Sequence, residues 1–218
     1  MTASVVTSFQ TTEQLYESLR KVESAFGKNA ITLGWMAFDR VNYQSPSDYT
    51  SVSSTRISVK YANGDTATIY GKNLTGATRS ISKLDYHFQD GTDASLSGSV
   101  TSTTSKPLAG NITQVTLSKS GKGTTTFYGN SDVSGQNISI TKQVTDIDNV
   151  HYEETGTTTG RLLINGSDYR LSYESATSSR SIDTADQSFV ISGLSYKTNS
   201  QTPYTSPEIT LRSLLSGN

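Results

Sequence analysis

The chain has 218 residues, a formal net charge of −1 and no cysteine, and 33% of its residues are hydrophobic and 17% charged. The near-neutral charge and the lack of a Lys/Arg cluster argue against a nucleic-acid partner, and no run approaches the roughly 18 apolar residues of a membrane-spanning helix. Without cysteine the chain has no disulfide, thiolate metal site or cysteine nucleophile.

The N-terminal segment predicts a helix and no Sec signal peptide. Residues 1–19 lack the basic region and the long apolar run of such a signal. Residues 11–27 begin with Thr11 as a helix cap and Gln14 three positions later, which is the spacing of a capping box. Apolar residues then recur at intervals of three and four, which makes one helix face apolar. That stripe, which we expect to pack on a sheet, comprises Leu15, Leu19, Val22 and Phe26.

The rest of the chain predicts β structure. Residues 30–44 have the richest apolar density and favour one or two core strands. From about residue 50 onward, short alternating runs are separated by turn residues, which predicts roughly ten strands, several of them antiparallel. Asn63-Gly64 and Asn165-Gly166 are typical of two-residue hairpin turns, and residues 161–173 form the clearest hairpin.

We therefore predict a mainly β fold, an antiparallel β-sandwich with one N-terminal amphipathic helix packed on the sheet. A β-solenoid is the alternative, although its coils need a more regular period than this sequence has. Residues 1–50 supply the helix and core strands, and residues 51–218 supply a Ser/Thr/Gly-rich β region. We expect the two parts to form one continuous domain.

A faint internal repeat runs through the second part. The segment DTATIYGKNLTG at 65–76 matches GTTTFYGNSDVSG at 123–135, so that Tyr70-Gly71 lies over Tyr128-Gly129. Two copies would indicate a duplicated unit of several strands. The alternative is independent use of the same strand and turn residues in a chain of low diversity.

The chain has two histidines, and each has a tyrosine neighbour and nearby carboxylates. Since His and Tyr both ligate iron, His87, Tyr86 and His151 are candidate ligands of a metal or haem. The alternative is that they are ordinary strand residues, because alternation puts Tyr86 and His87 on opposite faces of one strand. Two neighbours on opposite faces cannot ligate one ion without a bulge.

Paired acidic residues provide candidates for a calcium site. Asp146 and Asp148 form one pair, and Asp90 and Asp93 form another. Both pairs lie in turn-like segments, and calcium prefers several oxygen ligands on a turn. Neither pair has the spacing of an EF-hand loop, so solvated turn acids are the alternative interpretation.

Motifs of catalysis are missing from the sequence. It has no nucleophile elbow, Walker loop or His-Glu-x-x-His motif. An exported glycan hydrolase would have to use Asp146, Asp148, Glu153 or Glu154 as acid and base, and nothing in their spacing selects one pair. We therefore expect no enzymatic activity.

The chain ends on its most leucine-dense stretch, SPEITLRSLLSGN. Leu211, Leu214 and Leu215 are expected to form a last strand or turn that seals this domain's core or that of a neighbour. This C-terminal stretch resembles the segments that precede the calcium-binding repeats of bacterial RTX proteins, and residues 65–100 resemble the Ser/Thr/Gly-rich β modules of those proteins. The glycine-rich repeats themselves are missing.

The resemblance implies type I secretion, an extracellular location and a place within a larger surface or matrix protein, and it transfers no catalytic residue. Together with the composition, it favours a non-enzymatic structural, adhesive or self-assembling module of a bacterial surface or biofilm matrix. Its expected partners are further copies or other matrix components, and calcium is the one candidate cofactor. The alternatives are a secreted ligand-binding protein of the haemophore type and an exported glycan hydrolase.

Overall fold

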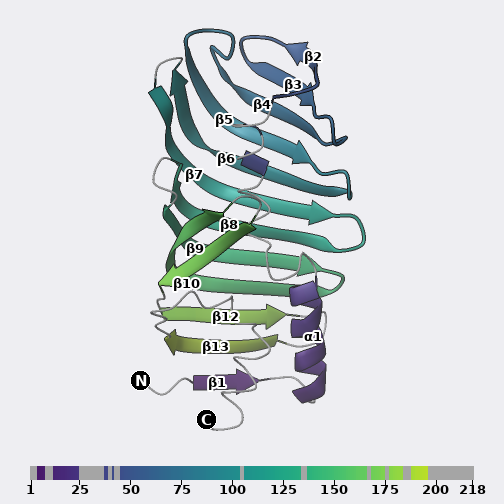
Figure 1. The fold of residues 1–218 in the computed structure, drawn as a ribbon. Helices are drawn as coiled ribbons and strands as arrows, with labels where there is room; N and C mark the ends of the chain where they lie inside the picture. The colour runs from purple at the N-terminus through teal and green to yellow at the C-terminus, as the bar shows by residue number, and fades with distance from the viewer. Residues whose placement is uncertain are drawn as a thin grey trace.

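The described strands form a single antiparallel sheet with the helix α1 beside it (Figure 1). The structure, a computed structural model, describes residues 4–7, 12–24, 37–38, 41, 45–103, 106–133, 137–165, 168–174, 177–183 and 188–195. The helix is α1 (Thr12–Ser24). The strands are β1 (Ser4–Thr7), β2 (Asp48–Val52), β3 (Arg56–Lys60), β4 (Thr66–Lys72), β5 (Thr78–His87), β6 (Thr92–Thr103), β7 (Lys106–Lys119), β8 (Gly123–Asp132), β9 (Asn137–Ile147), β10 (Val150–Asn165), β11 (Asp168–Glu174), β12 (Thr177–Asp183) and β13 (Ser188–Ser195).

The strands follow one another across the sheet nearly in chain order. The order is β1-β13-β12-β10-β9-β8-β7-β6-β5-β4-β3-β2, and β11 pairs with β10 off this path. In Figure 1 the strands are stacked into a column with β2 at one end and β1 at the other. The predicted mainly β, antiparallel fold with an N-terminal helix is confirmed. The sheet is open, so the choice between a sandwich and a solenoid stays a prediction.

Helix α1 is amphipathic, as its spacing predicts. Leu15, Leu19 and Val22 are buried, and the helix contacts β9 and β10. The opposite side carries exposed charged residues, among which Arg20 donates a hydrogen bond to Glu13 over 3.3 Å. The expected cap at position 11 and the end of the stripe at position 26 lie outside the described residues.

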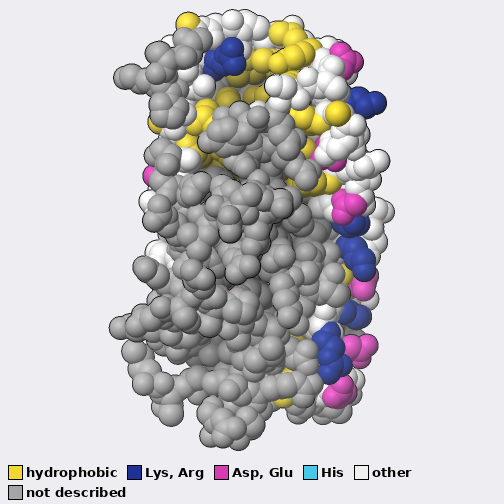
Figure 2. Space-filling view, in the orientation of Figure 1, with side chains coloured by type: hydrophobic (Ala, Val, Ile, Leu, Met, Phe, Trp, Pro, Cys, Tyr) yellow, Lys and Arg dark blue, Asp and Glu magenta, His cyan; other side chains and the backbone are white. Residues whose placement is uncertain are grey.

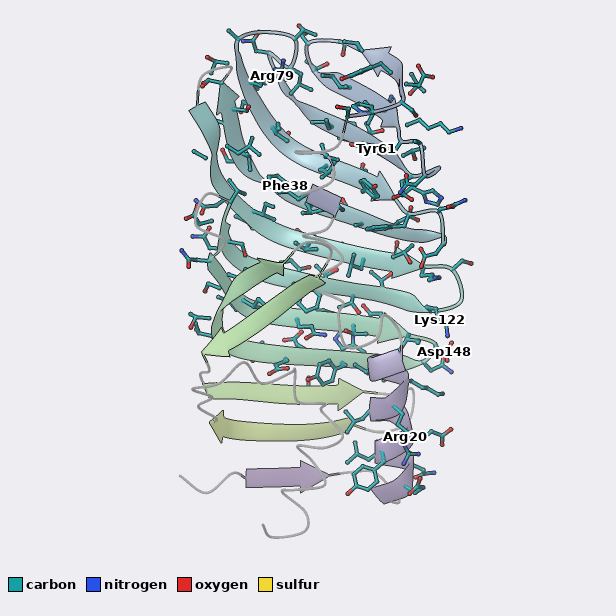
Figure 3. The ribbon with its side chains drawn as sticks, viewed as in Figure 1. Arg20, Phe38, Tyr61, Arg79, Lys122 and Asp148 are labelled. Carbon is teal, nitrogen blue, oxygen red and sulfur yellow. The ribbon has the colours of Figure 1, made fainter. Side chains whose placement is uncertain are left out.

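The prediction of strands over residues 30–44 is wrong at the positions that the structure describes. Ala37, Phe38 and Val41 are helical. Ala37 belongs to the main core cluster, and the other two pack against it; Phe38 is labelled in front of the sheet in Figure 3. Ala37 and Phe38 lie four and three residues before Val41, which fits one helix face, and periodicity in a short apolar run does not separate a buried helix from a buried strand.

Alternate residues of the strands build the core on one face of the sheet, which we call the inner face. Leu84 opposes Leu96 across the strands β5 and β6, and Val115 and Phe127 continue the same row on β7 and β8. Burial of each such side chain contributes about 1.5–3 kcal/mol. The core cluster comprises Ala37, Val59, Tyr61, Ala67, Leu84, Tyr86, Phe88, Ala94, Leu96, Val100, Ile112, Val115, Leu117, Phe127 and Ile138.

The hairpin turns agree with the predicted positions but differ in type at Asn63-Gly64. Gly64 N–H donates to the carbonyl of Tyr61, and Tyr61 N–H donates to the carbonyl of Asp65, which leaves a three-residue loop rather than two residues. Gly64 has a φ of 89°, a left-handed conformation that closes such loops. The predicted hairpin over 161–173 is confirmed as β10 paired with β11.

The internal repeat corresponds to one recurring hairpin. Tyr70-Gly71 and Tyr128-Gly129 both lie at shifts in the strand register. Across each shift a hydroxyl donates to the tyrosine carbonyl, from Ser82 over 3.4 Å and from Thr141 over 3.3 Å. The hairpin β6–β7 has the same feature, with Thr113 on its second strand donating to the Ser97 carbonyl over 3.3 Å. In β2–β3 the donor, Thr50, is on the first strand instead. The repeating unit is therefore one hairpin of about 30 residues, half the length that the sequence match predicts.

Candidate functional site

The face opposite the core, the outer face, is polar along its length. His87, Asp93, Ser118, Thr124, Asp146 and His151 occupy one continuous row across the strands β5 to β10. Two residues further along each of these strands, the next side chain on the outer face in most cases also carries a hydroxyl group or a charge. Thr116 and Thr126 share a hydrogen bond of 3.1 Å there.

Two histidine–aspartate pairs lie in this row. His87 Nδ1 lies 2.6 Å from an oxygen of Asp93, and His151 Nδ1 lies 2.6 Å from an oxygen of Asp146. An ionised carboxylate only accepts hydrogen bonds, so Nδ1 is the protonated nitrogen in both rings. All four side chains are about half exposed, and pairs of this kind contribute little to stability because water screens them.

A shallow groove of about 270 Å³ lies on the outer face at β4–β7. Two of its lining groups are engaged with each other, since Asp85 accepts from Ser95 over 2.7 Å. Asp85 also accepts from Lys83, beside the groove, over 2.8 Å. A serine nucleophile needs a base within hydrogen-bond reach, and Ser95 donates to Asp85 rather than to His87. The groove is lined by Thr66, Ala67, Thr68, Asp85, Tyr86, His87, Asp93, Ala94, Ser95, Thr116 and Ser118.

The structure keeps the two predicted calcium pairs apart. Asp90 and Asp93 belong to the β5–β6 turn region, and Asp146 and Asp148 to the β9–β10 turn region. Three strand intervals separate β6 from β9, which corresponds to about 14 Å. Within the described residues, no group of three or more His, Asp or Glu side chains is placed to hold a metal ion. Lys122 lies in the β7–β8 turn and Asp148 in the β9–β10 turn; both are labelled in Figure 3.

The Asp90 carboxylate illustrates how these turn acids are engaged. Lys119 Nζ lies 2.9 Å from it, and the Thr92 backbone N–H donates to it over 2.9 Å. These hydrogen bonds, that of Lys119 foremost, lower the pKa of Asp90 to about 2. Figure 2 shows basic and acidic side chains interspersed along this side of the molecule.

Replacing Lys119 by glutamine is expected to raise the pKa of Asp90 toward its ordinary value of 3.8. Because the folded-state pKa is depressed, this ion pair stabilises the fold above pH 3.8 and loses its effect as the pH falls through about 2. An NMR titration of the Asp90 carboxyl carbon measures the shift. Lys122→Gln, the same charge change in the same turn, should leave the midpoint unchanged; equal midpoints in all three proteins would refute the assignment.

The predicted haem ligands lie on different faces and far apart. Tyr86 is buried on the inner face, with 1% of its surface exposed, whereas His87 is on the outer face. His151 shares the row of His87 but is five strand intervals away, or about 24 Å. The structure therefore does not bring Tyr86, His87 and His151 together.

The two neighbouring glutamates considered for hydrolysis point to opposite faces of β10. Glu153 is on the outer face and pairs with Lys142 over 2.7 Å. Glu154, its neighbour, accepts a hydrogen bond from the Tyr152 hydroxyl over 3.0 Å. Since neighbours on a strand point to opposite faces, the two carboxylates do not flank a common substrate position.

Sequence reasoning missed a buried polar cluster at the β3–β4 turn. Asp65 is 2% exposed and accepts hydrogen bonds from the Tyr86 hydroxyl over 2.7 Å, the Gln89 backbone N–H over 2.8 Å and the Asn63 amide over 2.8 Å. Burial raises the pKa of Tyr61 to about 12, and Tyr49 and Asp65 act in the same direction; Tyr61 is labelled in Figure 3. The cluster ties the β3–β4 turn to the β5–β6 turn.

Tyr86→Phe is expected to lower the free energy of unfolding by about 1–3 kcal/mol. The change removes one donor from the buried Asp65 carboxylate while keeping the ring that packs on Phe88 at 4.7 Å. Urea unfolding measures the loss. Tyr128→Phe, at a tyrosine that is 39% exposed, provides the control, and equal stabilities of the two variants would contradict a structural role for the Tyr86 hydroxyl.

The second feature missed by sequence reasoning is an exposed edge strand. All five residues of β2 are exposed, and β2 pairs with β3 alone within the described part of the chain. Tyr49 and Val52 are 60% and 55% exposed, the largest values among the bulky apolar side chains that the structure describes. Figure 2 shows hydrophobic side chains gathered at this end of the molecule.

The predicted assembly residues Leu211, Leu214 and Leu215 lie outside the described residues. No helix in the described part of the chain is long and apolar enough to cross a membrane. The chain matches no protein-family model, and comparison with curated proteins and with solved structures gives no match.

Proposed function

We propose that this chain is a non-enzymatic extracellular module that self-associates through the edge of its sheet, as a structural or adhesive component of a bacterial surface or biofilm matrix. The observation that carries the proposal is the exposed edge strand β2, with Tyr49 60% and Val52 55% exposed.

An open edge strand presents a row of unpaired N–H and C=O groups that another chain can pair with. Monomeric proteins protect such edges with lysines, prolines or a covering segment. Strand β2, DYTSV, is short and has a bulge between Tyr49 and Ser51, which are two further protective features. It has, however, one charge at its start, no proline, and two exposed apolar side chains, Tyr49 and Val52. Its exposed apolar side chains would become buried when a further strand is added, so pairing gains apolar burial as well as hydrogen bonds.

The extracellular location is supported by composition and by the resemblance of the chain's end to segments that precede RTX repeats. The outer face carries the ion pairs Lys83–Asp85, Lys119–Asp90 and Lys142–Glu153. Among the described bulky apolar side chains, the two most exposed lie at the edge strand β2 instead.

Sedimentation velocity over a wide range of protein concentration, with and without calcium, tests this proposal. We expect the weight-average mass to rise with concentration, and a variant with Tyr49→Lys and Val52→Lys to stay monomeric. Tyr128→Lys, on the outer face of a central strand, is the matched control and should assemble like the original chain. A chain that remains monomeric throughout, or a control that fails equally, would contradict the proposal.

A further inference from the structure

We propose that the partner of β2 is the strand β1 of a second copy, so that the copies join head to tail into an open-ended filament. This inference rests on the proposed self-association. It specifies that the β2 edge of one copy pairs with the β1 edge of the next. The exposure of β2 alone does not determine this choice.

Strand direction is the first step. Twelve strands lie on the path from β1 to β2, and each neighbouring pair on it is antiparallel. Because twelve is even, β1 and β2 run in opposite directions. A second copy placed beyond β1 in the same orientation therefore offers a β2 that is antiparallel to β1, and the alternation continues without a break.

The register of the sheet is the second step. The row that begins at Tyr49 on β2 passes through Tyr86 and Leu117 and ends at Thr7 on β1. The neighbouring row begins at Val52 and ends at Val5. Because of the bulge on β2, Tyr49 and Val52 are three residues apart, whereas Val5 and Thr7 on β1 are two residues apart. With that bulge also spanning the new contact, Tyr49 of one copy opposes Thr7 of the next while Val52 opposes Val5.

The positions of the two edges are the third step. Figure 1 places β2 and β1 at opposite ends of the column, and within the described residues each pairs with one strand only. A head-to-tail contact uses both edges and repeats without closing, which produces a filament. A contact of β2 with β2 would give a closed dimer and leave β1 unpaired.

A charge exchange between the two edges distinguishes these arrangements. The first variant carries Tyr49→Lys and Val52→Lys, the second carries Val5→Glu and Thr7→Glu, and the third combines all four changes. Head-to-tail pairing predicts that the first and the second each raise the concentration needed for assembly by about tenfold or more, because charges replace apolar neighbours. The third variant should recover assembly, since each lysine then opposes a glutamate of the next copy.

The outcomes separate the inference from the proposed function. If the original chain assembles but the combined variant stays monomeric, or if the second variant assembles normally, head-to-tail pairing is wrong and the proposed self-association stands. If the original chain never assembles, both are wrong. Far-UV circular dichroism checks folding, and the pair Tyr49→Lys with Thr7→Glu repeats the exchange with fewer changes should the combined variant unfold.

Discussion

Alanine in place of Gly129 is expected to lower the free energy of unfolding by about 3 kcal/mol or more. A Cβ at this position would lie 1.9 Å from the Ser139 carbonyl oxygen and 2.9 Å from Ile140 Cα. Both are backbone atoms of the paired strand β9, so a side-chain rotation cannot relieve the clash. The β8–β9 ladder would have to separate at the bulge that the repeat places there.

Chemical denaturation of Gly129→Ala measures this loss, and Gly71→Ala tests the equivalent position, where a Cβ would lie 1.9 Å from the Ser80 carbonyl oxygen. Gly121→Asn is the control, because nothing lies within 4 Å of its Cβ position and asparagine tolerates its φ of 71°. If Gly129→Ala is as stable as Gly121→Asn, the close approach of β8 and β9 is not as described.

Leu117→Ala is expected to cost about 2–5 kcal/mol of stability, because it leaves a cavity at the centre of the sheet. Leu117 has 0% of its surface exposed and opposes Ala94 and Thr125 on its two neighbouring strands. Small neighbours of this kind leave little side chain to fill the space. Urea unfolding of the variant gives the cost.

Leu117→Met keeps nearly the same volume and serves as the control, with an expected loss below about 1.5 kcal/mol. Equal losses for the alanine and methionine variants would mean that shape rather than volume dominates at this site. A loss below about 1 kcal/mol for Leu117→Ala would contradict the inner face as the core of the fold.

The elements that depend only on residues close together in the sequence could be predicted from it. The apolar stripe of Leu15, Leu19 and Val22 predicts α1 and its buried side, and alternation with turn residues predicts the succession of antiparallel strands. The 161–173 segment pairs as predicted because a hairpin depends on its own turn and two flanking runs. The same logic separates Tyr86 from His87, since strand alternation alone places them on opposite faces.

The features that sequence reasoning missed depend on contacts between distant segments. In the sequence, Asp65 resembles the other acidic residues found in turns. It becomes a buried hydrogen-bond acceptor only because Tyr86 and Gln89 approach it from another hairpin. Ala37 and Phe38 are helical because they cover the inner face, a requirement set by strands that come later in the chain. Strand β2 becomes an edge through the order of the whole sheet, which its five residues do not encode.

The pairing of His87 with Asp93 and of His151 with Asp146 was missed for the same reason. Each pair joins the two strands of one hairpin across its turn, and the sequence distances differ because the turns differ in length. The sequence pointed to all four residues as candidate ligands of iron or calcium. The structure instead pairs them with one another on a polar, exposed face.

Amide hydrogen exchange of the assembled chain tests the open-edge account most directly. Ser53 N–H donates to the Arg56 carbonyl over 2.8 Å, so strand alternation directs the Val52 N–H toward the open edge. We predict that the Val52 amide gains protection as protein concentration rises, while the Val115 amide in the central strand β7 is unchanged. Assembly that leaves the Val52 amide unprotected and protects residues elsewhere would contradict the account.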